Sequence, residues 1–111
     1  MRFTTSISNN RQFQRLYRSG KHAVDGFFAI YCHRNRVGGN RLGLTVSTKI
    51  GKAVVRNRVR RRMKEIYRLQ ETQLGRGWDV VIVARVRARY ATYVQLEQSF
   101  RKLTDKLGLR T

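Results

Sequence analysis

Seven consecutive residues near the middle of the chain are the strongest candidates for chemistry. Positions 56–62 contain five arginines, interrupted only by Asn57 and Val59. The planar guanidinium of arginine can hold two phosphate oxygens at once, and it can also stack on an exposed base. Because arginine rather than lysine dominates, the run favours structured nucleic acid over diffuse charge attraction. The sequence therefore predicts a phosphate-rich ligand.

The charge of the whole chain indicates the same class of partner. Lysine and arginine number 25 against 6 acidic residues, which gives a formal net charge of +19 and a pI near 11.7. A polyanion would relieve the mutual repulsion of these charges. No apolar run approaches the roughly 18–20 residues of a membrane span, so we expect no membrane role. A ribosomal or other structural RNA-binding protein and a non-specific DNA binder both fit this charge.

The arginine run falls on a predicted helix that extends from Val54 to about Leu74. At about 100° per residue, one face of this helix is mostly apolar and the opposite face is cationic. The apolar face carries Val55, Val59, Met63, Ile66 and Gln70. The cationic face carries Asn57, Arg61, Lys64 and Arg68, with Arg58 and Arg60 on its flanks and Arg56 and Arg62 beside the apolar stripe. We expect the apolar face to pack on a sheet.

A charge run of this kind can also be an ordinary solvated helix surface. Like charges at positions i and i+4, however, destabilise a helix by about 0.2–0.5 kcal/mol per pair. Only Glu65 and Glu71 lie near enough along the chain to offset them. Because the pattern is costly without a partner, binding is the favoured interpretation.

Three other segments have the patterns of strands. Residues Phe27–His33 and Arg41–Ser47 alternate between two faces, and the glycine-containing loop Asn35–Asn40 between them predicts an antiparallel hairpin. Trp78–Ala84 is apolar almost throughout, as expected of a strand that is covered on both faces. We expect this last strand to be central in the sheet.

Two further helices complete the predicted fold. One extends from about Asn10 to Arg18 with Asn9 or Asn10 as its cap, and the other begins at a capping box formed by Thr92 and Gln95. The order is helix, strand, strand, helix, strand, helix in a single domain, residues 1–111, of the α+β class. We expect a small mixed sheet with the helices on one face and the other face open to a ligand.

The sequence offers little for metal binding or hydrolysis. Cys32 and His33 are adjacent on a predicted strand and point to opposite faces, which with His22 does not resemble zinc spacing. The acidic residues are scattered singly, so we expect no metal site and no catalytic residue in the protein. The lone cysteine and the absence of an apolar secretory signal predict a cytoplasmic protein.

The segment from Lys49 to Arg61 narrows these alternatives. It reads Lys-Ile-Gly-Lys-Ala-Val-Val-Arg-Asn-Arg-Val-Arg-Arg, which resembles the signature of the bacterial ribonuclease P protein subunit family. The similarity extends to Phe13, Tyr17 and Gly20 and to the predicted strands, which all stand in family order. Only the termini and the loop Asn35–Asn40 have no counterpart in the family pattern.

The resemblance implies a small basic subunit of an endoribonuclease. Such a subunit binds a large catalytic RNA and the 5′ leader of precursor tRNA, and it assists removal of that leader. Catalysis is expected to reside in the RNA, which would also hold most of the Mg²⁺, with no obligate protein partner. The resemblance also implies a left-handed βαβ crossover of the ribosomal S5 domain 2-like type, although right-handed connections are the default.

The resemblance assigns residues to two RNA surfaces. Together with the cationic face, it predicts RNA binding by Lys49, Lys52, Arg56, Asn57, Arg58, Arg60, Arg61, Lys64 and Arg68. It also implies a leader-binding cleft between the first helix and the sheet, at Phe13, Tyr17, Phe28 and Tyr31. Unpaired bases stack on aromatic rings, which suits this choice of residues. Phe28 shares a strand face with Ile30 and Cys32, so core packing is an equal alternative for it.

Overall fold

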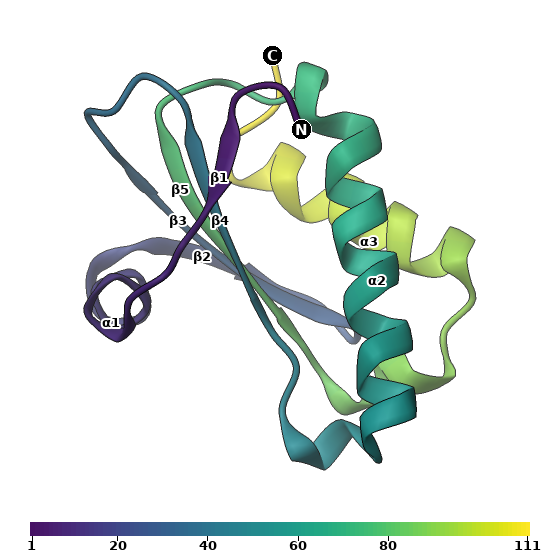
Figure 1. Ribbon diagram of the computed structural model, residues 1–111. Coiled ribbons are helices and arrows are strands. Elements are labelled where there is room, and N and C mark those ends of the chain that lie inside the picture. Colours follow the sequence, from purple (N-terminus) through teal and green to yellow (C-terminus); the bar gives the residue numbers. More distant parts are fainter.

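The computed structural model describes residues 1–111 and contains one five-stranded sheet and three α-helices. The helices are α1 (Asn10–Ser19), α2 (Ala53–Gln70) and α3 (Tyr93–Lys106). The strands are β1 (Thr4–Ser6), β2 (Lys21–Val24), β3 (Phe28–Arg34), β4 (Asn40–Thr45) and β5 (Trp78–Ala84). Short 3₁₀ turns occupy η1 (Thr48–Ile50), η2 (Glu71–Gln73) and η3 (Val86–Tyr90). The predicted α+β class and mixed sheet are confirmed (Figure 1).

The sheet has the order β1-β4-β5-β3-β2, so β5 is central as predicted. β5 pairs in parallel with β4 and antiparallel with β3. The predicted hairpin between β3 and β4 is therefore wrong, because β5 lies between these two strands. Val80, Val81 and Ile82 are almost fully buried, and only a central position covers both faces and both edges of so apolar a strand. The alternation of β3 and β4 identified them as strands but carried no information about their partner.

Both edge strands were absent from the predicted order. β1 pairs in parallel with β4, and β2 pairs antiparallel with β3. Each is only three or four residues long, β1 is polar throughout and β2 is half polar, so neither shows a pattern that stands out in the sequence. Their short length also suits edge positions, where a long exposed strand would invite aggregation.

The helices lie on both faces of the sheet, which corrects the prediction that they share one face. α2 and α3 cover one face, where Ile30, Ile82 and Phe100 belong to the main hydrophobic core. α1 lies on the other face, as Figure 1 shows, with Leu16 packed against Val81 and Ile7 in a smaller cluster. Because every second side chain of β5 points to this face, the sheet needs a second cover, and α1 supplies it only in part.

Helix α2 packs as the helical periodicity predicts. Val59, Met63, Ile66 and Gln70 are buried, and Tyr67 joins them beside the predicted stripe. The helix ends at Gln70, earlier than predicted, and continues into η2. It links β4 to β5, so it crosses between two neighbouring parallel strands.

The predicted caps of the other two helices are confirmed. The side chain of Asn9, rather than Asn10, accepts a hydrogen bond from the Gln12 amide at the start of α1. Thr92 and Gln95 form a complete capping box at the start of α3. No helix in the structure combines the length and the apolar character that crossing a membrane requires.

Candidate nucleic-acid interface

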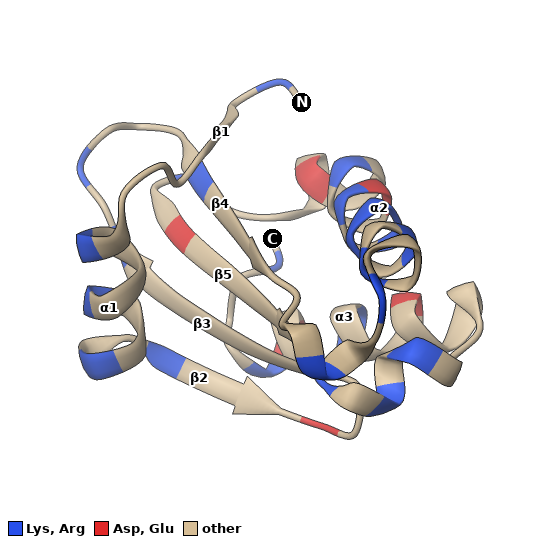
Figure 2. Cartoon of the chain, turned by 60° about the horizontal axis from the view of Figure 1, so that its bottom comes forward, with Lys and Arg blue, Asp and Glu red and all other residues tan.

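The side of α2 that points away from the core carries a row of five basic residues and one asparagine, which we call the cationic face. It consists of Asn57, Arg58, Arg60, Arg61, Lys64 and Arg68, and all six are exposed. Arg56 and Arg62 are half-buried beside the core, as the helical wheel predicts. Figure 2 shows basic residues along α2 and on the outer side of α1, and few acidic residues near either. Lys49 and Lys52 are exposed just before α2 begins.

Contacts within the protein divide the cationic face into occupied and unoccupied side chains. Arg58 donates to the carbonyl of Arg89 (3.2 Å). Arg68 holds Glu65 through two hydrogen bonds of 3.1 and 2.6 Å, which keep the pKa of Glu65 below its usual value. Arg61 and Lys64 make no ion pair and no side-chain hydrogen bond within the chain. These two cations are the ones most available to a phosphate.

Three of the four predicted cleft residues come together on the α1 side of the sheet, in what we call the aromatic cleft. The rings of Phe13 and Tyr17 are 6.4 Å apart, and those of Tyr17 and Tyr31 are 5.1 Å apart in an edge-to-face arrangement. The Tyr17 hydroxyl bonds the hydroxyl of Thr45 (3.0 Å), and Tyr17 remains 41% exposed. His22 stacks on Tyr31 at 5.5 Å. The cleft therefore presents aromatic surface to solvent above the sheet.

Phe28, the fourth predicted cleft residue, lies in the core. It is 1% exposed and packs in the cluster beneath α2 and α3. Successive side chains of a strand point to opposite faces, so Phe28 shares its face with Ile30 and Cys32, whereas Tyr31 faces α1. Of the two alternatives left open by the sequence, the structure thus selects core packing for Phe28.

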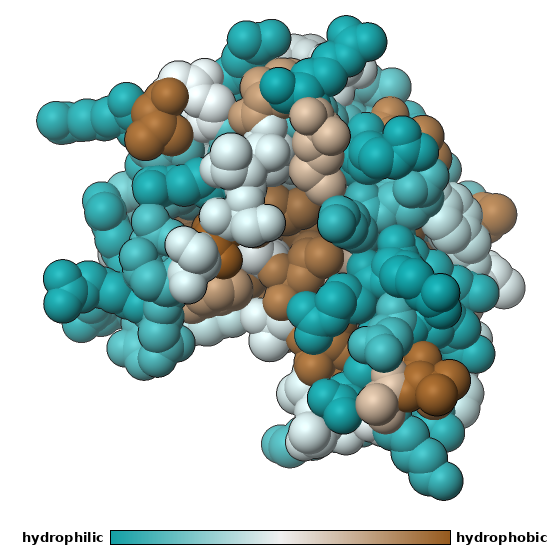
Figure 3. All heavy atoms as spheres, viewed as in Figure 1, coloured by the Kyte–Doolittle hydropathy of each residue, from teal (hydrophilic) through white to brown (hydrophobic).

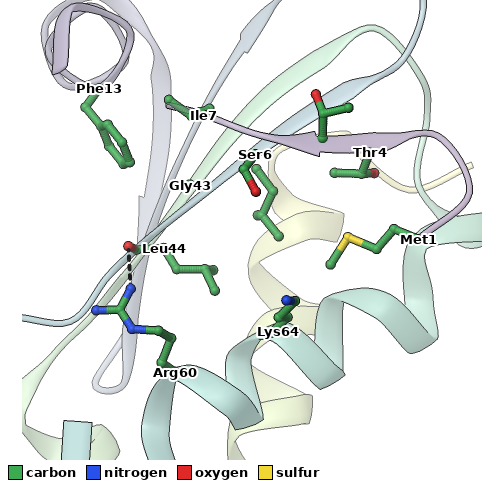
Figure 4. Close-up of a pocket in the computed structure, with 11 residues that line it drawn as sticks. Met1, Thr4, Ser6, Ile7, Phe13, Gly43, Leu44, Arg60 and Lys64 are labelled. Atoms are coloured by element: carbon green, nitrogen blue, oxygen red, sulfur yellow. Dashed lines mark hydrogen bonds between the residues drawn. The ribbon is translucent and has the colours of Figure 1, made fainter. Parts of the chain in front are cut away.

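A glycine of β4 allows Phe13 to approach the sheet. A Cβ atom added to Gly43 would lie 2.6 and 2.7 Å from two ring atoms of Phe13 and 3.3 Å from Val81. The missing side chain lets the ring lie directly against the strand. Phe13 also forms one wall of a pocket of about 490 Å³ at the edge of β4, which is closed on its other side by Arg60 and Lys64 (Figure 4).

Comparison with known proteins identifies the family to which the chain belongs. The family model described as Ribonuclease P matches residues 1–108. The chain belongs to the ribonuclease P protein family. It is 41% identical to the ribonuclease P protein component of Thermoanaerobacter sp. (strain X514), over 93% of this chain and 89% of that protein. It is 36% identical to that of Clostridioides difficile (strain 630), over 96% and 94%.

A solved structure agrees with this family. The RNase P protein of Staphylococcus aureus superposes with a TM-score of 0.88 at 28% identity, covering 96% of this chain and 97% of that chain. Membership in the ribonuclease P protein family makes the chain a subunit of an endoribonuclease that acts in tRNA processing, and it implies partnership with the RNA of ribonuclease P.

One basic segment of this ribonuclease P family member was missed in the sequence. Arg85, Arg87 and Arg89 alternate with small or apolar residues around η3, between β5 and α3. Arg89 donates to the carbonyl of Ile50 (3.4 Å), so the segment lies beside η1 and the start of α2. The alternation of arginines in the sequence could have predicted this basic segment. It extends the positive surface beyond the segment that resembles the family signature.

The acidic residues of the chain are mostly engaged within the fold. Asp25 accepts from the amides of Phe27 and Phe28 and from Ser99, and Asp79 pairs with Arg41 at 2.7 Å. Glu71 is 2% exposed and accepts from the amides of Arg2 (2.7 Å) and Phe3 (3.2 Å). No group of three or more His, Cys, Asp or Glu side chains is placed to hold a metal ion.

Proposed function

We propose that this protein binds the catalytic RNA of ribonuclease P through the cationic face and the single-stranded leader of precursor tRNA in the aromatic cleft. It thereby assists the endonucleolytic removal of the leader that creates the mature 5′ end. The observation that carries the proposal is the division of one small fold into two surfaces of different chemistry. The charged surface lies on α2, and the aromatic surface lies on the opposite side of the sheet beside α1.

Exposed cations without partners support the assignment of the cationic face to the RNA subunit. Arg61 and Lys64 can each take a phosphate oxygen without breaking a contact inside the protein. Arg58 and Arg60 are exposed beside them and make only side-chain bonds to backbone carbonyls. Lys49 and Lys52 continue the positive surface beyond the start of the helix. Neutralised phosphates release counterions, which gives an affinity that is strong at low salt.

The geometry of the aromatic cleft supports the assignment to the leader. Bases inside a duplex are stacked on one another, so exposed rings are useful mainly to an unpaired strand. Tyr17 and Tyr31 are held edge to face, and the bond from Tyr17 to Thr45 fixes the first ring over the sheet. A single-stranded leader can place its bases on these rings without melting any helix, and every base has a face that can stack.

The catalytic groups are proposed to come from the RNA. The acidic side chains do not cluster, and five of the six are engaged with partners in the protein, so they do not fit a magnesium site built from this chain. We therefore propose that Mg²⁺ is held mainly by the RNA subunit. The protein residues position RNA and neutralise phosphate charge.

Reconstitution tests this function directly. The protein is added to the RNA subunit at low magnesium concentration, and both cleavage and binding are measured for a precursor tRNA and for the mature tRNA. We expect faster cleavage and tighter binding of the precursor, with little change for the mature tRNA, because only the precursor carries a leader. If the protein gave no stimulation over the RNA alone, the proposed function would be wrong. Binding without stimulation would favour a structural RNA-binding role instead.

A further inference from the structure

A pocket connects the two proposed RNA surfaces at the edge of the sheet. Its walls come from β1 and β4, with Phe13 on the α1 side and Arg60 and Lys64 on the α2 side (Figure 4). Figure 3 shows a strip of apolar side chains between the hydrophilic surfaces of α1 and α2 in this view. The volume of about 490 Å³ lies within the range of roughly 300–1,000 Å³ that is typical of small-molecule sites.

The inner wall of the pocket is an open strand edge. β1 pairs with β4 only as far as Leu42, and the chain then turns away toward α1. Leu44 faces this edge with no strand beside it, and its carbonyl accepts a long hydrogen bond of 3.4 Å from Arg60. The N–H of a strand residue points to the same side as its carbonyl. Because β1 ends before it reaches Leu44, the N–H of Leu44 has no backbone partner on this side. The wall thus offers a hydrogen-bond donor beside apolar surface.

The pocket continues the aromatic cleft. The row of rings runs from Tyr31 through Tyr17 to Phe13, and Phe13 is shared between the cleft and the pocket. A strand of RNA that leaves Tyr17 along this row therefore reaches the edge of β4. There it meets Lys64, which has no partner in the protein, and Arg60, whose one contact is weak.

We propose that this pocket receives one unpaired nucleotide of the precursor-tRNA leader, beyond those that stack on Tyr17 and Tyr31. Its phosphate lies against Lys64 and Arg60, and its base lies between the ring of Phe13 and the open edge at Leu44. The inference rests on the proposed function and adds to it a position on the leader. The combination of a cationic rim, an aromatic wall and an open backbone edge fits a nucleotide better than an apolar peptide.

The test fills the pocket without changing its charge. Ser6 lines the pocket from β1, whereas Ser8 is exposed just outside it, so Ser6→Trp and Ser8→Trp form a matched pair. Each variant is assembled with the RNA subunit, and binding is measured for precursor tRNAs whose leaders are lengthened one nucleotide at a time. Thermal unfolding of both variants checks the fold. Lys64→Ala is a second variant that keeps the pocket open but removes the phosphate contact. Because Lys64 also belongs to the cationic face, this variant is assembled at a saturating concentration of the RNA subunit, and only its dependence on leader length is compared.

We expect the affinity of the wild type to rise at one particular leader length, and we expect Ser6→Trp to lack this rise. The wild type and Ser8→Trp should gain about fivefold or more when the leader reaches the pocket, as expected for one stacked base. Ser6→Trp should bind shorter leaders normally and lack this gain, and Lys64→Ala should lose part of it at the same length. These changes would support the pocket as a leader site.

Two results would overturn the inference while the proposed function stands. In the first, Ser6→Trp follows the wild type at every leader length. In the second, it binds all precursors and mature tRNA equally weakly, which would assign the pocket to the RNA subunit or to the fold. If the wild type itself gained nothing from any leader nucleotide, the proposed leader binding would fail together with the pocket.

Discussion

The cationic face and the aromatic cleft differ in how the fold holds their side chains. On the cationic face, Arg61 and Lys64 extend from one helix into solvent and have no internal partners. In the cleft, Tyr17 and Tyr31 come from different elements and are held in contact by the packing of α1 on the sheet. The first surface acts through charge, which reaches several ångströms and is screened by salt. The second acts through contact, which requires a fixed geometry.

The two surfaces therefore have different roles: the cationic face attracts RNA of any sequence, and the aromatic cleft selects single-stranded RNA. A row of exposed charges binds many RNAs with similar strength, because phosphates carry no sequence information. Rings over a sheet distinguish a single strand from a duplex, since only unpaired bases can stack on them. We therefore expect substitutions on α2, apart from Arg60 and Lys64 beside the pocket, to change binding to all RNAs together, and substitutions in the cleft to affect only RNAs with a leader.

The largest effect is expected on the cationic face. Replacing both Arg61 and Lys64 with alanine should weaken binding to the RNA subunit by about 3 kcal/mol, since two charge-assisted contacts are lost. The slope of log affinity against log salt should fall by up to about 1.8 units, from about 0.9 per phosphate contact. Titrations at several salt concentrations measure both. Arg101→Ala is the matched control, because Arg101 is an exposed arginine of α3 that lies outside the cationic face and pairs with Glu97, so the slope should change little. An unchanged slope in the double variant would place these residues away from RNA.

The next effect belongs to the cleft and should be restricted to the leader. Tyr31→Ala should weaken binding of precursor tRNA by about 2 kcal/mol through the loss of one stacked base. Binding of mature tRNA and the salt slope should stay close to those of the wild type. Tyr31→Phe keeps the ring and should restore precursor binding. Equal losses for precursor and mature tRNA would show that the two surfaces are not separable in this way.

The cationic face was predictable from the sequence, and much of the cleft was not. Because a helix repeats every 3.6 residues, the helical periodicity alone correctly predicts that Arg61 and Lys64 are exposed and that Val59 and Met63 are buried. Those positions depend only on local geometry. The cleft depends on which strands pair and on which face α1 lies, and no local pattern carries this information.

Phe28 and the missing hairpin show the same limit. Alternation along β3 placed Phe28 with Ile30 and Cys32, but it could not say which face of the sheet α1 would cover. The insertion of β5 between β3 and β4 follows from long-range burial of an apolar strand rather than from the loop that joins them. The cleft was predicted from the resemblance to a family, and the structure shows that Phe28 belongs to the core instead.

Glu71 allows the fold to be weakened without changing either surface. Burial alone would raise the pKa of Glu71, but hydrogen bonds from Thr4 and from the amides of Arg2 and Phe3 outweigh it, so the pKa lies below its ordinary value of 4.5. A carboxylate with a lowered pKa stabilises the fold above the unfolded pKa, and this contribution is lost as pH falls through the folded value. Glu71→Gln should therefore lower the free energy of unfolding by about 1–2 kcal/mol at neutral pH.

The same substitution should flatten the loss of stability below pH 4.5. Urea unfolding at a series of pH values measures this. Asp25 also has a lowered pKa and should leave part of the acid dependence in place. At neutral pH, where the variant remains folded, the salt slope and the preference for precursor tRNA should both match the wild type. A changed preference would mean that the hydrogen bonds from the amides of Arg2 and Phe3 to Glu71 also position the β1 wall of the pocket.

The smallest effect is expected from the hydroxyl of Tyr17. Its bond to Thr45 is exposed, so Tyr17→Phe should cost no more than about 0.5–1 kcal/mol of precursor affinity while the ring still stacks. Thr45→Val removes the same bond from the other side and should give the same loss, with no further loss when the two substitutions are combined. Precursor binding by the two single variants and the double variant completes this cycle. Additive losses would mean that each hydroxyl contacts RNA on its own, and the cleft would then select the leader partly through hydrogen bonds.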